Sequence, residues 1–127
     1  MRKRPPITRR SITHKFEIRG KDELVEGYIT VGRSEDGAPV EIFLIIAKAG
    51  ETLRGIARCW GMSMSWCLQN GVPMSQIVER YKYQRFEPAG LTGNPDIQIA
   101  HSIADYVARW LEITFSSRTV SATDPPF

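Results

Sequence analysis

Three short segments near the start of the chain alternate apolar and polar residues, and this pattern constrains the fold more than any other feature. They are Ser11–Ile18 (SITHKFEI), Gly27–Gly32 (GYITVG) and Val40–Ile46 (VEIFLII). A period of two is typical of strands that bury one face. Asp36 and Gly37 form a tight-hairpin signal between the second and third segments. The sequence therefore predicts an antiparallel meander of three strands. The apolar run that ends the third segment favours a central place for it in the sheet.

The segment from Glu51 to Asn70 has the three- and four-residue spacing of an amphipathic helix. The predicted buried stripe is Leu53, Ile56, Ala57, Trp60, Met64, Cys67 and Leu68. The opposite face is predicted to carry Arg54, Arg58, Ser65 and Gln69. Small residues in this helix, such as Gly61, allow another backbone to approach closely. Because small proteins commonly associate about a two-fold axis, we expect a homodimer through this helix.

Two more helices are predicted towards the end of the chain. Met74–Tyr81 follows a proline, which suits the first turn of a helix. Asn94 and Pro95 form a helix-start pattern, so we expect the final helix to run from there to Leu111. Asp105 and Arg109 are predicted to form an i,i+4 pair on its outer side. Its predicted buried stripe is Ile99, Ile103, Tyr106, Val107, Trp110 and Leu111.

The predicted fold class is α+β, with a three-stranded antiparallel β-meander followed by three helices packed on one face of the sheet. With 127 residues, of which 42% are hydrophobic and 24% charged, the chain has the length and composition of one globular domain. We place this domain at residues 11–115 and expect a flexible tail over residues 116–127.

The basic residues are concentrated in the first ten positions. The segment MRKRPPITRR holds five of the seventeen Lys and Arg residues and no acid, and the whole chain has a net charge of +3. The remaining residues are therefore mildly acidic and predict no basic face for nucleic acid. We interpret residues 1–10 as a disordered, solubilising arm, and the alternative is an arm that contacts phosphate groups.

Hydropathy and cysteine spacing exclude several classes of protein. The basic start lacks the apolar stretch of a signal peptide, and no segment is long and apolar enough to span a membrane. We therefore expect a cytoplasmic protein, in the host cytoplasm if it is phage-encoded. Cys59 and Cys67 lie too far apart in the predicted helix for a disulfide, and their spacing is not that of a zinc site. We interpret both as buried small hydrophobic residues.

The residues predict no catalytic group and no metal site. The glycine-containing segment GLTGNP has neither the dinucleotide-binding spacing nor the Walker spacing. His14 lies on the apolar face of the first predicted strand, without a carboxylate at a matching position. We interpret it as a hydrogen-bonded residue inside the domain rather than as a ligand or base.

Segment 83–101 is the best candidate for a binding site, because it combines polar side chains with turn residues. The candidate ligand-binding residues are Tyr83, Arg85, Phe86, Thr92, Asn94, Asp96 and His101. The arginine suits an anion, the aromatic rings suit stacking, and the Thr, Asn and Asp side chains suit hydrogen bonds. Backbone N–H groups at the start of the final helix favour negative charge, which suits a nucleotide or another phosphorylated molecule. The alternative is that these residues only shape a long connection.

Several phrases of the sequence, in this order, resemble the TSCPD-type domain. They are HKFEIRG, EGYITVG, EDGAPVEIFLIIAKAGETLRGI, LQNGVP and RFEPAGLTGNPDIQIAHSIADYVARWL. The resemblance extends from Ser11 to Leu111. That domain occurs near the C-terminus of vitamin B12-dependent (class II) ribonucleotide reductases and also as short free-standing proteins.

The resemblance implies a non-catalytic accessory domain. In those reductases the radical chemistry belongs to a large barrel with its own cysteines and an adenosylcobalamin site, and 127 residues leave no room for that barrel. No cofactor is therefore expected in this chain. Cys59 and Cys67 do not resemble the thiol pairs of the reductases either.

Three functions follow as hypotheses. In the first, the chain is a module of ribonucleoside-diphosphate reductase whose partner is the catalytic subunit. In the second, it is a free-standing, phage-encoded protein that sequesters a nucleotide-derived signal in segment 83–101. In the third, it binds nucleic acid through the basic arm. A neighbouring reductase gene would favour the first, a phage or defence setting the second, and strongly salt-dependent DNA binding the third.

Overall fold

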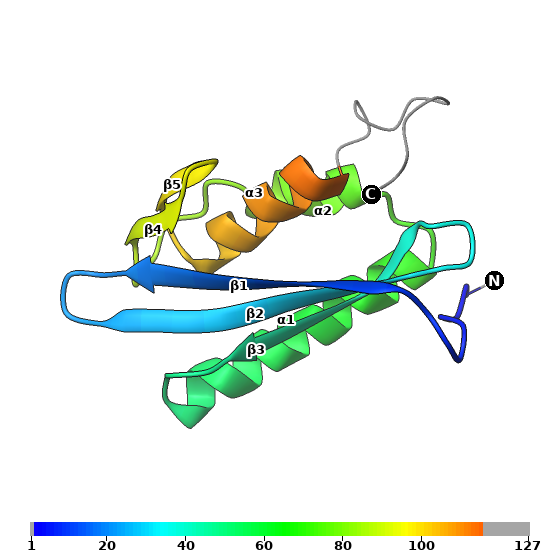
Figure 1. Ribbon diagram of the computed structural model, residues 1–127, viewed down its shortest axis with the longest axis horizontal. Helices are drawn as coiled ribbons and strands as arrows, with labels where there is room; N and C mark the ends of the chain where they lie inside the picture. The colour runs from blue at the N-terminus through cyan, green and yellow to red at the C-terminus, as the bar shows by residue number, and fades with distance from the viewer. Residues whose placement is uncertain (1, 116–127) are drawn as a thin grey trace.

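The computed structural model describes residues 2–115, and its order of strands and helices is that of an α+β domain (Figure 1). Three long strands come first, β1 (Ser11–Arg19), β2 (Leu24–Arg33) and β3 (Pro39–Ile46). Two helices follow, α1 (Glu51–Gln69) and α2 (Met74–Tyr81). The short strands β4 (Gly90–Asn94) and β5 (Ile97–Ala100) then lead into helix α3 (Ile103–Phe115).

The five strands form one antiparallel sheet in the order β3-β2-β1-β4-β5. The predicted meander is confirmed, with Phe16 opposite Gly27 and Gly27 opposite Ile46. Strand β4 joins β1 only through the pair Arg19 and Leu91. Most of the outer edge of β1 is therefore not paired with another described strand.

The prediction of three strands was incomplete, and the predicted start of the final helix was wrong. Asn94 ends β4, Pro95 and Asp96 form the turn to β5, and the helix begins at Ile103. Ile99, predicted for the buried stripe of that helix, lies on β5 and is 54% exposed. Asn-Pro suits a turn as well as a helix start, and strands of five and four residues are too short to show a clear alternation.

Helices α1 and α3 cover one face of the sheet, and α2 packs against α3. The core between them includes Phe16, Ile18, Ile29, Leu44, Met64, Tyr106 and Leu111. The register places the alternate side chains on the opposite face, which no described helix covers. Five exposed apolar side chains lie on this open face, namely Leu24, Phe43, Ile45, Leu91 and Ile99.

Strand β3 lies at an edge of the sheet, not at its centre, and α1 covers that edge. Ser65 Oγ lies 2.7 Å from the N and 3.1 Å from the O of Ile42, and Gln69 Nε2 donates to Val40 O over 3.0 Å. A Cβ at Gly61 would lie 2.9 Å from Ile42 O. Ser65 and Gln69 therefore face the sheet, contrary to prediction, and the small residues serve a contact within the chain. The homodimer stays a prediction.

Residues 2–10 have no helix or strand, but several of their side chains contact the rest of the domain. The Arg2 guanidinium lies 4.8 Å from the Trp66 ring, and Lys3 Nζ lies 3.3 Å from an aspartate of the β2–β3 turn. Arg9 pairs through two nitrogens with the buried carboxylate of Glu41. Three of the five basic side chains of the arm thus have partners within the domain. Disorder of the arm stays a prediction.

Both cysteines are free and lie on α1. Cys67 is half-buried, whereas Cys59 is exposed, which corrects the prediction that both are buried. Ile56 of the predicted buried stripe is also exposed. Within residues 2–115, no helix has the length and apolar character that crossing a membrane requires. The predicted flexible tail, residues 116–127, lies outside the described residues.

Candidate ligand-binding site

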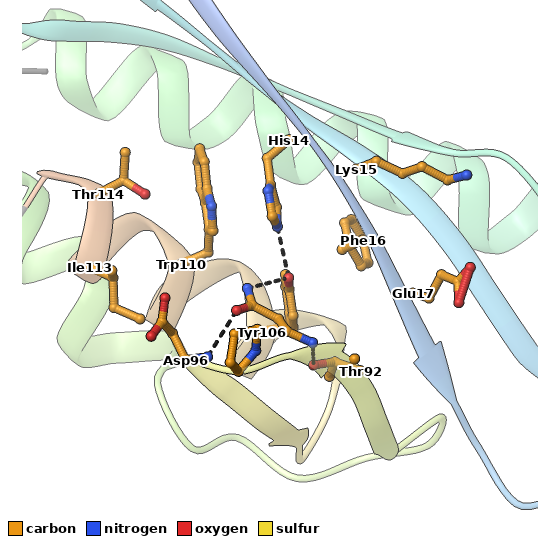
Figure 2. A pocket seen from close by; sticks show the side chains of 13 residues that line it. His14, Lys15, Phe16, Glu17, Thr92, Asp96, Tyr106, Trp110, Ile113 and Thr114 are labelled. Atoms are coloured by element: carbon orange, nitrogen blue, oxygen red, sulfur yellow. Dashed lines mark hydrogen bonds between the residues drawn. The ribbon is translucent and has the colours of Figure 1, made fainter.

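A cavity of about 620 Å³ lies where β1, the β4–β5 hairpin and α3 meet (Figure 2). Strand β1 contributes residues 14–17, the hairpin contributes residues 92–96, and α3 contributes Tyr106, Trp110, Ile113 and Thr114. A cavity of this size is typical of sites for small organic ligands. We call it the β1–α3 cavity.

A chain of hydrogen bonds joins the three walls of the cavity. The Tyr106 hydroxyl lies 2.8 Å from His14 Nε2 and 3.0 Å from Asn94 Nδ2 (Figure 2). Asn94 Oδ1 accepts the N–H of Asp96 over 2.9 Å, so the Asn94 amide must donate to the hydroxyl. The hydroxyl proton is then available to donate to His14 Nε2 in the tautomer that carries the histidine proton on Nδ1.

The hairpin turn is held in shape by its own side chains. Thr92 Oγ1 donates to Ile97 O and accepts the N–H of Asn94 over 3.0 Å. Gly93 has φ +77°, a conformation that favours glycine. These bonds fix the position of the Asn94 amide relative to α3, so the polar wall of the cavity is formed before any ligand arrives.

Aromatic rings form the other wall. The rings of His14 and Trp110 are nearly parallel with centroids 4.9 Å apart, and those of Phe16 and Tyr106 are nearly parallel at 5.0 Å. Burial lowers the pKa of His14 below its usual value of 6.5. Burial raises the pKa of the Tyr106 hydroxyl, and the hydrogen bond from Asn94 opposes this in part. Both groups are therefore neutral near pH 7.

The lowered pKa of His14 predicts a pH-dependent stability. Above pH 6.5, the pKa of histidine in the unfolded chain, His14 is neutral in both the folded and the unfolded chain. The free energy of unfolding then has its full value. As the pH falls below this pKa, the unfolded chain takes up the proton more readily, and the free energy of unfolding decreases. Urea denaturation between pH 7.5 and 5.5 should show this decrease in the native chain and a smaller one in His14→Gln. Tyr106→Phe keeps the histidine buried and should show the same decrease as the native chain. If the free energy of unfolding falls as steeply with pH in His14→Gln as in the native chain, the prediction is wrong.

The structure brings three of the predicted site residues together and separates the other four. Thr92, Asn94 and Asp96 all line the β1–α3 cavity. Phe86 lines a different, apolar groove between α1 and α2, and Arg85 is exposed, with no hydrogen bond or ion pair to a described residue. The two remaining residues, Tyr83 and His101, contact each other, with ring centroids 6.3 Å apart.

The start of α3 is occupied by a carboxylate of the chain itself. Asp105 is fully buried, and its oxygens accept the N–H groups of Tyr83 over 2.7 Å and of His101 over 2.9 Å. Arg109 Nη1 lies 3.2 Å from the same carboxylate, so the predicted pair exists, but Asp105 lies inside the domain and not on its outer side. The N–H of Asp105 is bonded to Ser102 Oγ. The backbone groups offered to a phosphate in the sequence-based hypothesis are therefore partly used within the domain.

Several residues of the cavity were missed from the sequence. Lys15 and Glu17 come from β1, and Tyr106 and Trp110 were assigned only to the core. His14 and Tyr106 are 92 residues apart in the chain, and no local pattern joins them. The one available signal was a histidine on the apolar face of a strand, which needs a polar partner from elsewhere.

Few charged groups line the cavity. Asp96 supplies a carboxylate, whereas the side chains of Lys15 and Glu17 lie on the open face of the sheet and only their backbone borders the cavity. Glu17 also lies 3.8 Å from Arg19. Among residues 2–115, no group of three or more His, Cys, Asp or Glu side chains is placed to hold a metal ion. The cavity therefore offers hydrogen bonds and aromatic surface more than a strong positive field.

Comparison with known proteins identifies the family. The family model described as the TSCPD domain matches residues 2–115. The chain belongs to the TSCPD domain family. It is 50% identical over 116 residues to a vitamin B12-dependent ribonucleotide reductase of Rhodopirellula baltica, which covers 91% of this chain and 11% of the reductase.

Other reductases show the same relation to this TSCPD chain. It is 41% identical to the vitamin B12-dependent ribonucleotide reductase of Streptantibioticus cattleyicolor over 91% of the chain and 18% of the reductase. For the Bradyrhizobium diazoefficiens enzyme of the same name, the identity is 36% over 92% of the chain and 9% of the reductase. The chain thus spans between about a tenth and a fifth of the length of these relatives. No solved structure matches it.

Proposed function

We propose that this TSCPD chain is a non-catalytic accessory domain for vitamin B12-dependent ribonucleotide reduction, and that it binds a nucleotide in the β1–α3 cavity. The observation that supports a ligand is the cavity itself, in which neutral aromatic rings face a preformed polar hairpin. The relatives are named as ribonucleotide reductases, so a ribonucleotide or deoxyribonucleotide is the matching ligand class. The partner would be the catalytic part of such a reductase.

The charges suggest how a nucleotide would lie. The base and sugar fill the cavity, where the Asp96 carboxylate of the hairpin accepts hydrogen bonds from ribose hydroxyl groups. The phosphates point outward, because the Asp96 carboxylate disfavours a phosphate chain deep inside. This arrangement differs from the sequence-based hypothesis, in which Arg85 held the anion.

The proposal assigns no radical step to this chain. The relatives carry vitamin B12 in their names, but a cavity of about 620 Å³ suits an ordinary small ligand rather than a corrinoid. We therefore assign no cofactor to these residues. Their proposed work is to bind the nucleotide, orient it and shield its base from water.

Thermal unfolding against a nucleotide panel tests the proposal. The panel holds NDPs, NTPs, dNTPs, cyclic oligonucleotides and ADP-ribose derivatives. A ligand at a hundred times its dissociation constant should add about 2.7 kcal/mol, which raises Tm by several degrees. Asn94→Ala removes a polar group from the cavity wall, and Thr114→Arg places a much larger side chain in the wall formed by α3, so both should abolish the shift.

Arg85→Ala is the matched control, because this exposed residue lies outside the cavity lining. The shift should survive in this variant. No shift with any member of the panel would overturn the proposed function. A shift that vanishes in Arg85→Ala but persists in Thr114→Arg would move the site back to the 83–86 segment.

A further inference from the structure

The free edge of β1 carries backbone groups whose direction can be worked out from the sheet. In an antiparallel sheet the N–H and C=O of one residue point to the same side, and successive residues alternate. Both groups of Ile42 contact Ser65 of α1, so Ile42 points away from β2. Its cross-strand partner Val31 therefore points towards β1 and bonds with Ile12.

Continuing the alternation along β1 assigns each residue to one side. His14, Phe16 and Ile18 bond with β2, so Thr13, Lys15, Glu17 and Arg19 point to the outer edge. Arg19 meets β4 there, as its pairing with Leu91 requires. Within residues 2–115, no ladder pair joins Thr13, Lys15 or Glu17 to a strand on this outer side.

Two of these three residues line the β1–α3 cavity. Lys15 and Glu17 belong to its wall, whereas Thr13 does not. Each presents one N–H donor and one C=O acceptor side by side, towards the space between β1 and the hairpin. The cavity therefore has, besides its side chains, a strip of strand edge that is ready to pair.

We infer that this strip reads the hydrogen-bonding edge of a nucleobase, through the N–H and C=O of Lys15 or Glu17. The inference rests on the proposed function and names the part of the nucleotide that the site recognises. Every nucleobase presents a donor and an acceptor side by side on its Watson–Crick edge, which complements such a backbone pair. The neutral rings of Tyr106 and Trp110 belong to the wall that α3 forms, and they suit the flat face of an uncharged base.

The pairing should dominate specificity. A site that hydrogen-bonds a ligand group strongly rejects an analogue that lacks it, because the buried protein groups are then left without partners. Blocking the base edge should therefore cost far more affinity than changing the sugar or the number of phosphates.

Edge-methylated nucleosides test the inference from the ligand side. Isothermal titration with the full chain compares adenosine with N6,N6-dimethyladenosine, cytidine with N4,N4-dimethylcytidine, guanosine with 1-methylguanosine and uridine with 3-methyluridine. For each nucleoside that binds, methylation should raise Kd at least tenfold. Equal affinities within each pair would overturn the inference and leave the proposed nucleotide site intact. Absence of binding by nucleosides and by the nucleotide panel alike would overturn both.

Proline substitutions test it from the protein side. Proline removes one N–H and is tolerated where that group points away from the ladder at a strand edge. Lys15→Pro or Glu17→Pro should weaken nucleoside binding at least tenfold, whereas Lys15→Ala and Glu17→Ala, which keep the N–H groups, should weaken it less. Thr13→Pro is the matched control, since its N–H is outward but outside the cavity. Circular dichroism and Tm establish that each variant is folded. Full binding by both cavity proline variants would overturn the inference.

Discussion

An Asp105→Ala variant should lose about 3–5 kcal/mol of unfolding free energy, the range expected when one partner of a buried, charged hydrogen-bond set is removed. The side chain is fully buried and accepts from Tyr83 N, His101 N and Arg109 Nη1. Without it, two backbone N–H groups lose their acceptor, and the Arg109 guanidinium loses its ion pair while it keeps its hydrogen bond to Ile99 O. Chemical denaturation with a two-state fit measures the loss.

Two further variants separate this role from a general charge effect. Asp105→Asn keeps one oxygen acceptor but replaces the other oxygen by an NH2 group, which then faces N–H donors. We therefore expect an intermediate loss of unfolding free energy. Glu112→Gln, on the same helix, removes a partly exposed ion pair with Lys82 and should change stability by less than about 1 kcal/mol. Equal losses of unfolding free energy in Asp105→Ala and Glu112→Gln would show that the buried carboxylate does not hold the segments around Tyr83 and His101 together.

The position of Asp105 also explains what the sequence could not reveal. Its spacing to Arg109 correctly predicted an ion pair, but a helical i,i+4 pair is usually a surface feature. The burial arises because the connections around Tyr83 and His101 both bring N–H groups to the same place. Such convergence depends on tertiary folding and leaves no periodic signal.

The long strands and helix α1 were predictable because their patterns are long. β1, β2 and β3 have eight to ten residues each, and α1 has nineteen, so period two and period 3.6 are clearly distinguished. The β4–β5 hairpin has no such length, and its Asn94-Pro95 turn imitates a helix start. The error moved the sequence-based binding site to a helix terminus, whereas Thr92, Asn94 and Asp96 line a cavity beside a strand edge.

Polarity and turn residues were sufficient to select part of the cavity. Thr92 and Asn94 were recognised because polar side chains in a glycine-containing connection seldom serve the core. Most of their side-chain hydrogen bonding nevertheless holds the turn itself, since Thr92 bonds to Ile97 O and Asn94 N, and Asn94 accepts from Asp96 N. Lys15 and Glu17 were unrecognisable as site residues, because their contribution comes from the unpaired edge of β1 and not from their side-chain type.

The close approach of β4 to β1 leads to the other large expected effect, in Gly90→Val. A Cβ at Gly90 would lie 1.9 Å from the Arg19 carbonyl oxygen and 2.9 Å from its carbon, and both are backbone atoms of the neighbouring strand. Neither can rotate away as a side chain would, so the strands must separate at their one paired position, Arg19 and Leu91.

We expect Gly90→Val to lose on the order of 3 kcal/mol, at the upper end of overpacking costs, and to lower Tm by roughly 10–20 °C. Because the hairpin carries Thr92 and Asn94 into the cavity, the proposed nucleotide binding should be lost even at temperatures where the rest of the sheet is folded. Gly55→Ala is the matched control, since a Cβ there meets no atom within 4 Å and alanine favours the helix. This control should keep both stability and binding. A Gly90→Val variant as stable as the native chain would mean that β4 does not pack against Arg19 in solution, and the cavity would then lose its polar wall.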